Sequence, residues 1–296
     1  MITVKNLIKS YGKETVLKGI DFTVSEGEIF ALLGPNGAGK TTTLECMEGL
    51  RRFEEGKIEI FGETPKKAME QGIIGIQLQS SSLPENITVT DAMKLFCSWN
   101  QINNRGDLLE RLGVKDLGGK AYKTLSTGQK RKLHLALALT HEPKVLFLDE
   151  PTAGLDVEAR AHLHQEIKTL KEQGTTIILA SHDMAEVESL CDRVGMIVEG
   201  KMRSIGSPRE IVAEVEKEQW IEVQWQGELP ELDFKYMTDH QMIRGVHRFK
   251  TEQRLAGLRE ILDFTEDSGL DLLDIRLEKP SLEERFIEIS KGGKLS

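Results

Sequence analysis

The sequence has few cysteines and no long apolar segment. Its 296 residues include three cysteines, Cys46, Cys97 and Cys191, which stand far apart and form no C-x-x-C pair. This spacing argues against a disulfide framework or a zinc site and favours a reducing compartment. No apolar run approaches the roughly 18–20 residues that a helix needs to cross a bilayer, and the first residues lack the pattern of a signal peptide. If the protein works at a membrane, another chain must supply the span.

Basic residues are in the minority. Lys and Arg number 39 against 48 Asp and Glu, so the net charge is −9. An acidic chain is a poor candidate for a nucleic-acid binder, and we expect no nucleic-acid partner. The length and the proportions of 39% hydrophobic and 29% charged residues fit a soluble globular protein with one large or two modest domains.

The most informative stretch runs from Gly34 to Thr42. It fits the pattern G-x-x-x-x-G-K-[S/T]. The apolar run at 29–33 before it predicts a buried strand, and the residues from Thr41 to about 49 predict a helix. Strand, loop and helix in this order are the context in which the motif binds phosphate.

Each residue type in this loop has a chemical reason. Glycines at 34, 37 and 39 let backbone N–H groups approach an anion without a Cβ in the way. The following helix adds its positive dipole end. We expect Lys40 to reach the β- and γ-phosphates and the Thr41 hydroxyl to bind Mg²⁺. The predicted nucleotide-binding residues of the loop are Gly34, Asn36, Gly37, Ala38, Gly39, Lys40, Thr41 and Thr42.

Two later apolar segments also end in reactive side chains. The strand predicted at 144–148 leads into Asp149 and Glu150, and the strand predicted at 176–180 leads towards His182. Ligands of parallel sheets bind at this carboxyl edge. Asp149 suits a Mg²⁺ ligand, Glu150 suits the group that polarises an attacking water, and a neutral His182 suits a hydrogen-bond partner of the γ-phosphate or that water. An isolated acidic strand end is often merely solvated, but the phosphate-binding loop in the same chain favours the functional interpretation.

Residues 125–129, Leu-Ser-Thr-Gly-Gln, precede an Ala/Leu-rich helix that Ser126 is well suited to cap. A helix start that carries a glycine and a hydroxyl is a second possible anion site. On these residues alone, an ordinary capped helix is the simpler interpretation.

The pattern divides the chain into regions. Alternating strands near 2–4, 20–24 and 57–61 predict an antiparallel β subdomain, and the mostly helical stretch at about 88–140 predicts an inserted helical subdomain. Helical spacing of Ala92, Leu95, Phe96 and Trp99 marks one helix there. The predicted fold is α/β, a P-loop NTPase core with these two insertions.

A charged linker near 214–219 separates a different tail. Strands are predicted at 220–225, 246–250 and 272–277, and helices at 252–266 and 281–289. Ser281 and Glu284 form a capping-box pattern. We therefore predict an ATP-binding domain at 1–215 and a small α+β accessory domain at 216–296 without a catalytic constellation.

Together, these motifs resemble the nucleotide-binding subunit of an ABC transporter over residues 1–215. Residues 34–42 match its Walker A motif and 145–150 its Walker B motif with the catalytic glutamate. Residues 125–129 match its signature, with Thr127 in place of the usual first glycine, which puts a side chain close to the partner's γ-phosphate. The resemblance implies that Ser126, Gly128 and Gln129 contact ATP held by a second subunit.

Four further positions match the family. Gln79 resembles the Q-loop glutamine, which implies a role in catalysis and metal binding, and Gln77 is the alternative register. Residues 153–156 resemble the D-loop, and His182 resembles the switch histidine. Tyr11 resembles the aromatic residue that stacks on adenine, although a core or turn tyrosine is the plain alternative.

The resemblance also implies partners and a place in the cell. It implies ATP and Mg²⁺, a head-to-tail pair of ATPase subunits, taken here as a homodimer, and a separate membrane permease. The chain would then be cytoplasmic and peripheral on the inner face of the cell membrane. The tail at 280–286 is similar to the end of single-domain exporter ATPases for drugs, antibiotics or sodium with ABC-2-type permeases; a variable addition of no fixed role is the alternative.

Two other functions compete with this one. A soluble ABC-type ATPase in translation or DNA repair usually carries two ATPase domains or a long coiled-coil insertion, and this sequence shows neither. A nucleotide sensor that does not hydrolyse ATP is disfavoured because Glu150 and His182 are both present.

Overall fold

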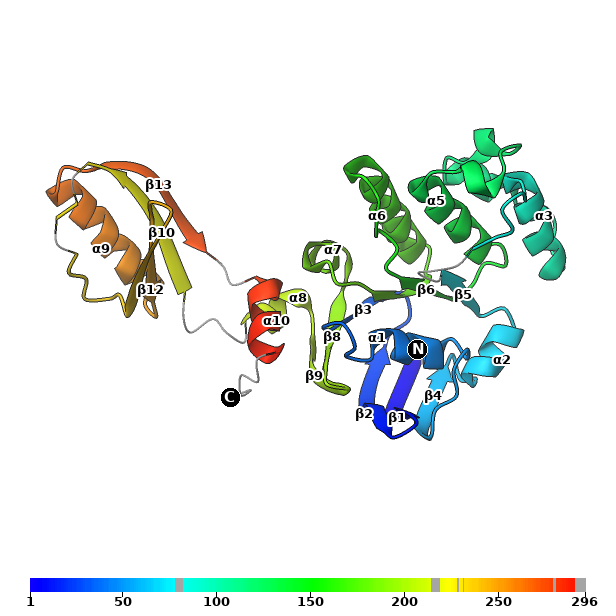
Figure 1. Cartoon of the computed structure of the whole chain (residues 1–296). Helices are drawn as coiled ribbons and strands as arrows, with labels where there is room; N and C mark the ends of the chain where they lie inside the picture. The colour runs from blue at the N-terminus through cyan, green and yellow to red at the C-terminus, as the bar shows by residue number, and fades with distance from the viewer. Residues whose placement is uncertain (78–81, 214–218, 228, 231, 279–280, 291–296) are drawn as a thin grey trace. The chain divides into compact units, whose positions relative to one another are not determined.

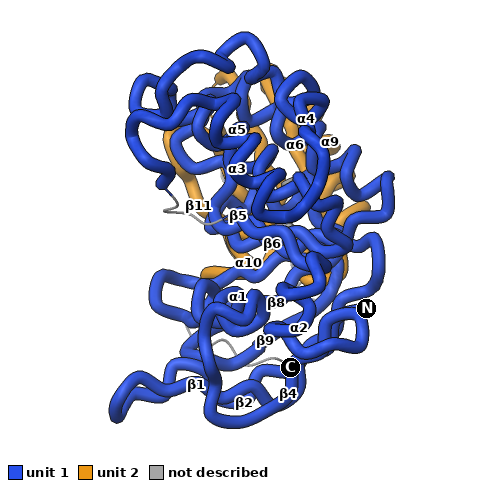
Figure 2. Tube along the Cα trace, turned by 90° about the vertical axis from the view of Figure 1, so that its right-hand side faces the viewer, with its two compact units in different colours: residues 1–208, 289–296 blue, residues 209–288 orange. Residues whose placement is uncertain are grey.

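The computed structural model describes residues 1–77, 82–213, 219–227, 229–230, 232–278 and 281–290. The chain forms two compact units, coloured separately in Figure 2: Met1–Pro208 with the chain from Ile289 on, and Arg209–Glu288. The predicted domain boundary between residues 215 and 216 lies outside the described residues. Among the helices that are described, none is both long and apolar enough to cross a membrane.

The centre of the first unit is a mixed sheet, in which the described strands follow the order β5-β6-β7-β3-β8-β9 (Figure 1). In this sheet order, each neighbouring pair from β5 across to β8 is parallel, and the edge strand β9 is antiparallel to β8. Every residue of β3, β6 and β7 is buried, as expected for parallel strands covered on both faces. The strands are β3 (Ile29–Leu33), β5 (Ile74–Gln77), β6 (Val145–Asp149), β7 (Thr176–Ala180), β8 (Arg193–Val198) and β9 (Lys201–Gly206).

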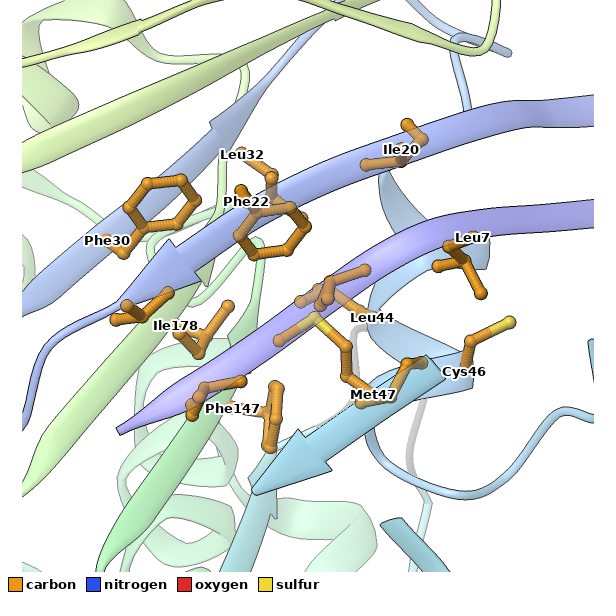
Figure 3. Close-up of a cluster of buried hydrophobic side chains, with 14 of the residues drawn as sticks. Leu7, Ile20, Phe22, Phe30, Leu32, Leu44, Cys46, Met47, Phe147 and Ile178 are labelled. Atoms are coloured by element: carbon orange, nitrogen blue, oxygen red, sulfur yellow. The ribbon is translucent and has the colours of Figure 1, made fainter. Parts of the chain in front are cut away.

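An antiparallel sheet of β2 (Glu14–Val24), β1 (Ile2–Tyr11) and β4 (Glu55–Ile60) packs against this central sheet, with α1 (Lys40–Met47) between them. Figure 3 shows the shared core, to which both sheets and α1 contribute buried side chains. Phe22 of β2 stacks on Phe30 of β3 with ring centroids 5.2 Å apart. The predicted antiparallel layer is confirmed, although its first two strands are longer than the alternating pattern indicated.

The predicted helical insertion is also confirmed. Between β5 and β6 lie α3 (Val89–Trp99), α4 (Gly106–Arg111) and α5 (Thr127–Ala138), with short 3₁₀ turns at Lys115–Leu117 and Tyr122–Thr124. The predicted apolar face of α3 is wrong in part. Val89, Ala92, Met93 and Cys97 are its buried residues, whereas Leu95 and Trp99 are exposed. The apolar residues of α3 allow two overlapping apolar faces. The face predicted from the sequence contains Leu95 and Trp99, but α3 packs against α5 through the face with Met93 and Cys97.

The rest of the first unit connects these layers. The long α6 (Val157–Glu172) buries Leu163, Ile167 and Leu170, and it follows β6 directly. Two short helices, α2 (Pro65–Glu70) and α7 (Met184–Leu190), were not predicted because six or seven residues give little periodicity. The helix α8 (Pro208–Ala213) begins at the boundary between the units.

The second unit is an α+β fold, as predicted. Its described strands follow the order β11-β12-β10-β13, and α9 packs on one face of that sheet through a core of Ile221, Val223, Trp225, Phe249 and Ile261. The edge strand β11 was missed because all five of its residues are exposed and show no alternation. Its elements are β10 (Gln219–Gln226), β11 (Asp239–Ile243), β12 (Val246–Thr251), α9 (Arg254–Asp267) and β13 (Asp271–Glu278). The last helix, α10 (Leu282–Ser290), begins in this unit and ends past its boundary, and the predicted capping box of Ser281 and Glu284 is present at its start.

One hydrogen bond anchors this second core. The indole Nε1–H of Trp225 donates to the Thr265 Oγ1 at 2.8 Å inside the sheet–helix interface. Trp225→Phe removes this hydrogen bond and some buried ring volume, while the Thr265 hydroxyl still donates to the Ile261 backbone oxygen at 2.7 Å. We therefore expect the free energy of unfolding of this unit to fall by about 1–3 kcal/mol. Urea unfolding followed by circular dichroism measures it, and Trp99→Phe at an exposed site is the control. An equal effect of the two variants would contradict the anchoring role.

Candidate functional site

The loop between β3 and α1 is shaped by contacts that favour glycine. A Cβ at Gly34 would lie 2.4 Å from the backbone oxygen of Ile197, and one at Gly39 would lie 2.5 Å from the Leu17 side chain. Gly39 also has a φ of 108° at the N-cap of α1. Gly37, with a φ of 81°, has open space around its Cα. Packing against β2 and β8 therefore requires two of the glycines, and backbone conformation explains the third.

Lys40 begins α1 and lies under the loop. Its side chain is buried, and its Nζ donates to the backbone oxygens of Gly34 at 2.7 Å and Pro35 at 3.3 Å. Burial lowers the pKa of Lys40, and the carboxylates of Glu150 and Asp149 oppose that shift. Phosphate oxygens would offer this ammonium stronger, anionic acceptors than the two carbonyl groups.

Asp149 and Glu150 stand at the end of β6. Asp149 is buried, and its pKa is raised, first by burial and then by the negative charge of Glu150. Glu150 has a φ of 49°, a left-handed conformation that costs a non-glycine residue about 1–3 kcal/mol. Its N–H donates to the Ala180 backbone oxygen at 2.9 Å, so β7 holds the strained residue in place.

The structure brings Glu150 and His182 into contact. The His182 Nδ1 lies 2.7 and 2.8 Å from the two carboxylate oxygens of Glu150, although 32 residues separate them. The His182 side chain is 69% exposed, whereas that of Glu150 is 12% exposed. The carboxylate of Glu150 is therefore mostly buried and contacts the imidazole of His182, which remains exposed to solvent.

Lys40, Asp149 and Glu150 share one cleft of about 390 Å³ with residues of the glycine loop. His182 contacts Glu150 but is not among the residues that line this cleft. The described residues that line it are Glu14, Val16, Asn36, Gly37, Gly39, Lys40, Thr41, Thr42, Asp149 and Glu150. Oxygen donors of this kind suit Mg²⁺, which is commonly held by one or two carboxylates together with water and substrate phosphates. Among the described residues there is no cluster of three or more His, Cys, Asp or Glu that could hold a metal ion without a ligand's help. The side chains present therefore fit a Mg²⁺ that arrives with a nucleotide.

The predicted signature residues are not among those that line this cleft. Ser126 caps α5 through a capping box, in which the Gln129 N–H donates to the Ser126 Oγ and the Ser126 N–H donates to the Gln129 Oε1. A Cβ at Gly128 would lie 3.5 Å from the side chain of Leu155, and one at Gly154 would lie 3.5 Å from the Thr127 methyl. The start of α5 thus lies beside residues 154–155 of the same chain, with Ser126 and Thr127 exposed.

Gly34, Ala38 and Tyr11 are also not among the residues that line the cleft. Tyr11 is 41% exposed at the end of β1, with the cationic groups of Lys9 and Arg51 over its ring at 5.3 and 5.4 Å. Gln79 lies outside the described residues. Gln77, the alternative register, ends β5 with its side chain fully buried, and neither amide atom has a hydrogen-bond partner among the described residues.

Three residues near the site were not predicted from the sequence. Glu14 and Val16 line the cleft from β2, a strand of the other sheet. Glu48 ends α1 as a buried carboxyl, and its pKa is raised to about 8 by burial first and then by the charges of Asp149 and Glu45. From sequence alone, a glutamate that follows a helix is expected at the surface, because this residue type is rarely buried.

With the fold and the cleft described, known proteins can be compared. The family model described as ABC transporter matches residues 17–153. The linearmycin resistance ATP-binding protein LnrL of Bacillus subtilis (strain 168) is 37% identical over 219 residues, covering 71% of this chain and 70% of that protein. The daunorubicin resistance ATP-binding protein DrrA3 of Streptomyces coeruleorubidus is 30% identical over 305 residues, covering 98% of this chain and 95% of that protein.

Solved structures of similar fold also come from ABC transporters. A solved ATP-binding subunit of an ABC transporter covers 72% of this chain and 92% of its own, with a TM-score of 0.67 and 27% identity. The cbiO1 protein from Clostridium perfringens, part of the ABC transporter complex cbiONQ, covers 72% of this chain and 90% of its own, with a TM-score of 0.64 and 33% identity. The chain belongs to the ABC transporter family, whose ATPase domains bind ATP, and it resembles the family's ATP-binding proteins.

The buried Glu48 predicts a pH dependence of stability. Its Oε2 has no hydrogen-bond partner among the described residues. A carboxyl whose pKa rises on folding from near 4.5 to about 8 is tolerated below pH 4.5, and the folded state loses stability as pH rises through 8. Glu48→Gln should therefore raise the free energy of unfolding at pH 9 by on the order of 2 kcal/mol and change it little at pH 5.

Urea unfolding at the two pH values measures this effect. Glu70→Gln, at an exposed position of α2, is the matched control and should leave the pH dependence unchanged. A Glu48→Gln variant that loses as much stability between pH 5 and pH 9 as the wild type would contradict the interpretation.

Proposed function

We propose that the chain is the ATP-hydrolysing subunit of an ABC exporter and drives a separate membrane permease. The observation that carries this proposal is the convergence of the glycine loop, Lys40, Asp149, Glu150 and His182 at one edge of the central sheet. The relatives add the transport part, since they are named for antibiotic resistance and for Nod factor export.

In this proposal the loop and α1 hold the triphosphate. Backbone N–H groups of residues 34–42 face the phosphates, and Lys40 exchanges its carbonyl acceptors for β- and γ-phosphate oxygens. Thr41 and Asp149 would hold Mg²⁺, with Gln79 as a third group from outside the described residues. The metal neutralises charge on the phosphates when bound. Tyr11 would stack on the adenine.

Hydrolysis needs a water in line with the γ-phosphate. Glu150 is placed to accept a proton from that water, because its carboxylate lines the cleft next to the loop. His182 keeps the carboxylate oriented through the contact at 2.7 Å and is exposed enough to meet the γ-phosphate. The left-handed backbone of Glu150 fixes the direction in which the side chain leaves the strand.

A second copy of the chain would complete the site. Ser126, Gly128 and Gln129 stand at an exposed or half-exposed helix start away from the cleft, where N–H groups and the helix dipole favour an anion. Head-to-tail pairing would bring this helix start onto ATP held by the other subunit. A highly charged ligand shared in this way closes the pair, and loss of the γ-phosphate reopens it.

Glu150→Gln separates binding from hydrolysis. The amide keeps the size of the side chain but cannot accept a proton, so we expect ATP hydrolysis to fall about 10²-fold or more while ATP still binds. The closed pair should then accumulate, which size-exclusion chromatography with ATP detects. Glu158→Gln, exposed in the first turn of α6, is the matched control. Turnover like that of the wild type would remove Glu150 from the role of base.

Partner capture distinguishes the exporter from a soluble ABC-type ATPase in translation or DNA repair. We expect the tagged chain to co-purify from detergent-solubilised membranes with a multi-span membrane protein, and its cellular place to be cytoplasmic and peripheral on the inner face of that membrane. Nucleic-acid binding at physiological salt should be absent, in line with the net charge of −9. A stable complex with ribosomes or DNA, without a membrane partner, would favour the other function.

A further inference from the structure

A buried carboxylate lies directly behind the His182 turn. Glu186 of α7 is 2% exposed, and its Oε2 accepts a hydrogen bond from the buried Ser181 Oγ at 2.5 Å. The Ser181 Oγ in turn accepts the Asp183 N–H at 3.1 Å, and the Asp183 Oδ1 accepts the Glu186 N–H at 3.1 Å. The backbone on both sides of His182 is therefore held in one closed set of hydrogen bonds.

The same set reaches α6. The His164 Nε2 lies 3.3 Å from the Glu186 Oε1, and the Arg160 Nη1 donates to the Asp183 Oδ2 at 3.1 Å. Arg160 and His164 are four residues apart, and Asp156, which caps α6 by accepting the Ala159 N–H, is four residues earlier. Arg160 and His164 thus share one face of α6, and Asp156 caps the helix just before it begins. Residues 154–155, which lie beside the start of α5, lead directly into this cap.

A carboxylate buried in this way is costly unless it is hydrogen-bonded, and Glu186 uses both of its oxygens. We propose that Glu186, with Ser181 and His164, is a positioning group that fixes the imidazole of His182 against Glu150 and ties that imidazole to α6. This inference rests on the proposed ATPase function. Glu186 lines no part of the cleft described above, so it acts through His182 and not on the nucleotide.

The arrangement predicts a separation of kinetic effects. The phosphates are gripped by the loop after β3, which Glu186 does not contact, so the KM for ATP should be conserved. Without the carboxylate, the Ser181 hydroxyl loses its acceptor and the turn gains freedom, so His182 spends less time against Glu150. The loss should therefore appear in kcat.

The test compares Glu186→Ala, Glu186→Gln and Ser181→Ala in the full chain. We expect kcat to fall about tenfold or more in the two alanine variants, with the KM for ATP within about twofold of the wild type. Glu186→Gln keeps an oxygen acceptor for Ser181 and should retain most of the activity. Glu172→Ala, an exposed position of α6, is the control. Unchanged kcat in the alanine variants, or an equal loss in the control, would overturn the inference.

A double variant tests whether the effect passes through His182. In a His182→Ala background, adding Ser181→Ala should cause no further loss, since the group being positioned is already gone. A full additional loss would show that Ser181 and Glu186 only support the fold. If Glu186→Ala does not fold, Ser181→Ala carries the test alone, because it removes a single oxygen.

The imidazole itself gives a readout that does not depend on turnover. In protein with ¹⁵N-labelled histidine, the His182 ring signals, assigned by their loss in His182→Ala, should shift or broaden in Ser181→Ala. Unchanged signals would overturn the positioning role. Failure of the proposed function would instead appear as hydrolysis that Glu150→Gln does not reduce, so the two failures are distinguishable.

Discussion

The burial of β3, β6 and β7 on both faces is the constraint on which the rest of the structure depends. These apolar strands are covered on both sides and run parallel within one sheet, so their carboxyl ends open at one edge. The register makes this specific: Leu32 of β3 and Asp149 of β6 both pair with Ala180 of β7. The loop after Leu33, the acidic pair and His182 therefore leave the sheet at the same level. A shift by one residue would turn Asp149 to the opposite face.

The edge formed in this way is electrostatically unfavourable by itself. Burial lowers the pKa of Lys40 and raises the pKa values of Asp149 and Glu48, so each charged form is costly where it stands. The positive charges of Lys40 and then Arg131 reduce this cost for Asp149, and a phosphate-bound cation would reduce it further. Such clustering of perturbed groups in a cleft is typical of functional sites, which often sacrifice stability for binding.

Rigidity at the site comes from the elements behind it. Glu150 keeps a left-handed backbone because the Ala180 carbonyl holds its N–H, and the His182 turn is held by Ser181 and Glu186. Through Arg160 and His164, α6 carries that support from the segment beside the start of α5. The contacts of α6 therefore reach the turn that carries His182.

Local signals were sufficient for the elements that carry the chemistry. Apolar runs predicted β3, β6 and β7, and the glycine pattern predicted the phosphate loop. Ser126 and Ser281 predicted the starts of their helices, which they cap through their side chains. Each of these features depends on residues close in the chain. What the tertiary structure decided involves distant partners. These are the contact of Glu150 with His182, the lining of the cleft by Glu14 and Val16, the burial of Glu48, and the choice of the buried face of α3. A sequence determines which segments are helix or strand through local periodicity, but which side chains meet depends on packing between layers that no local pattern contains.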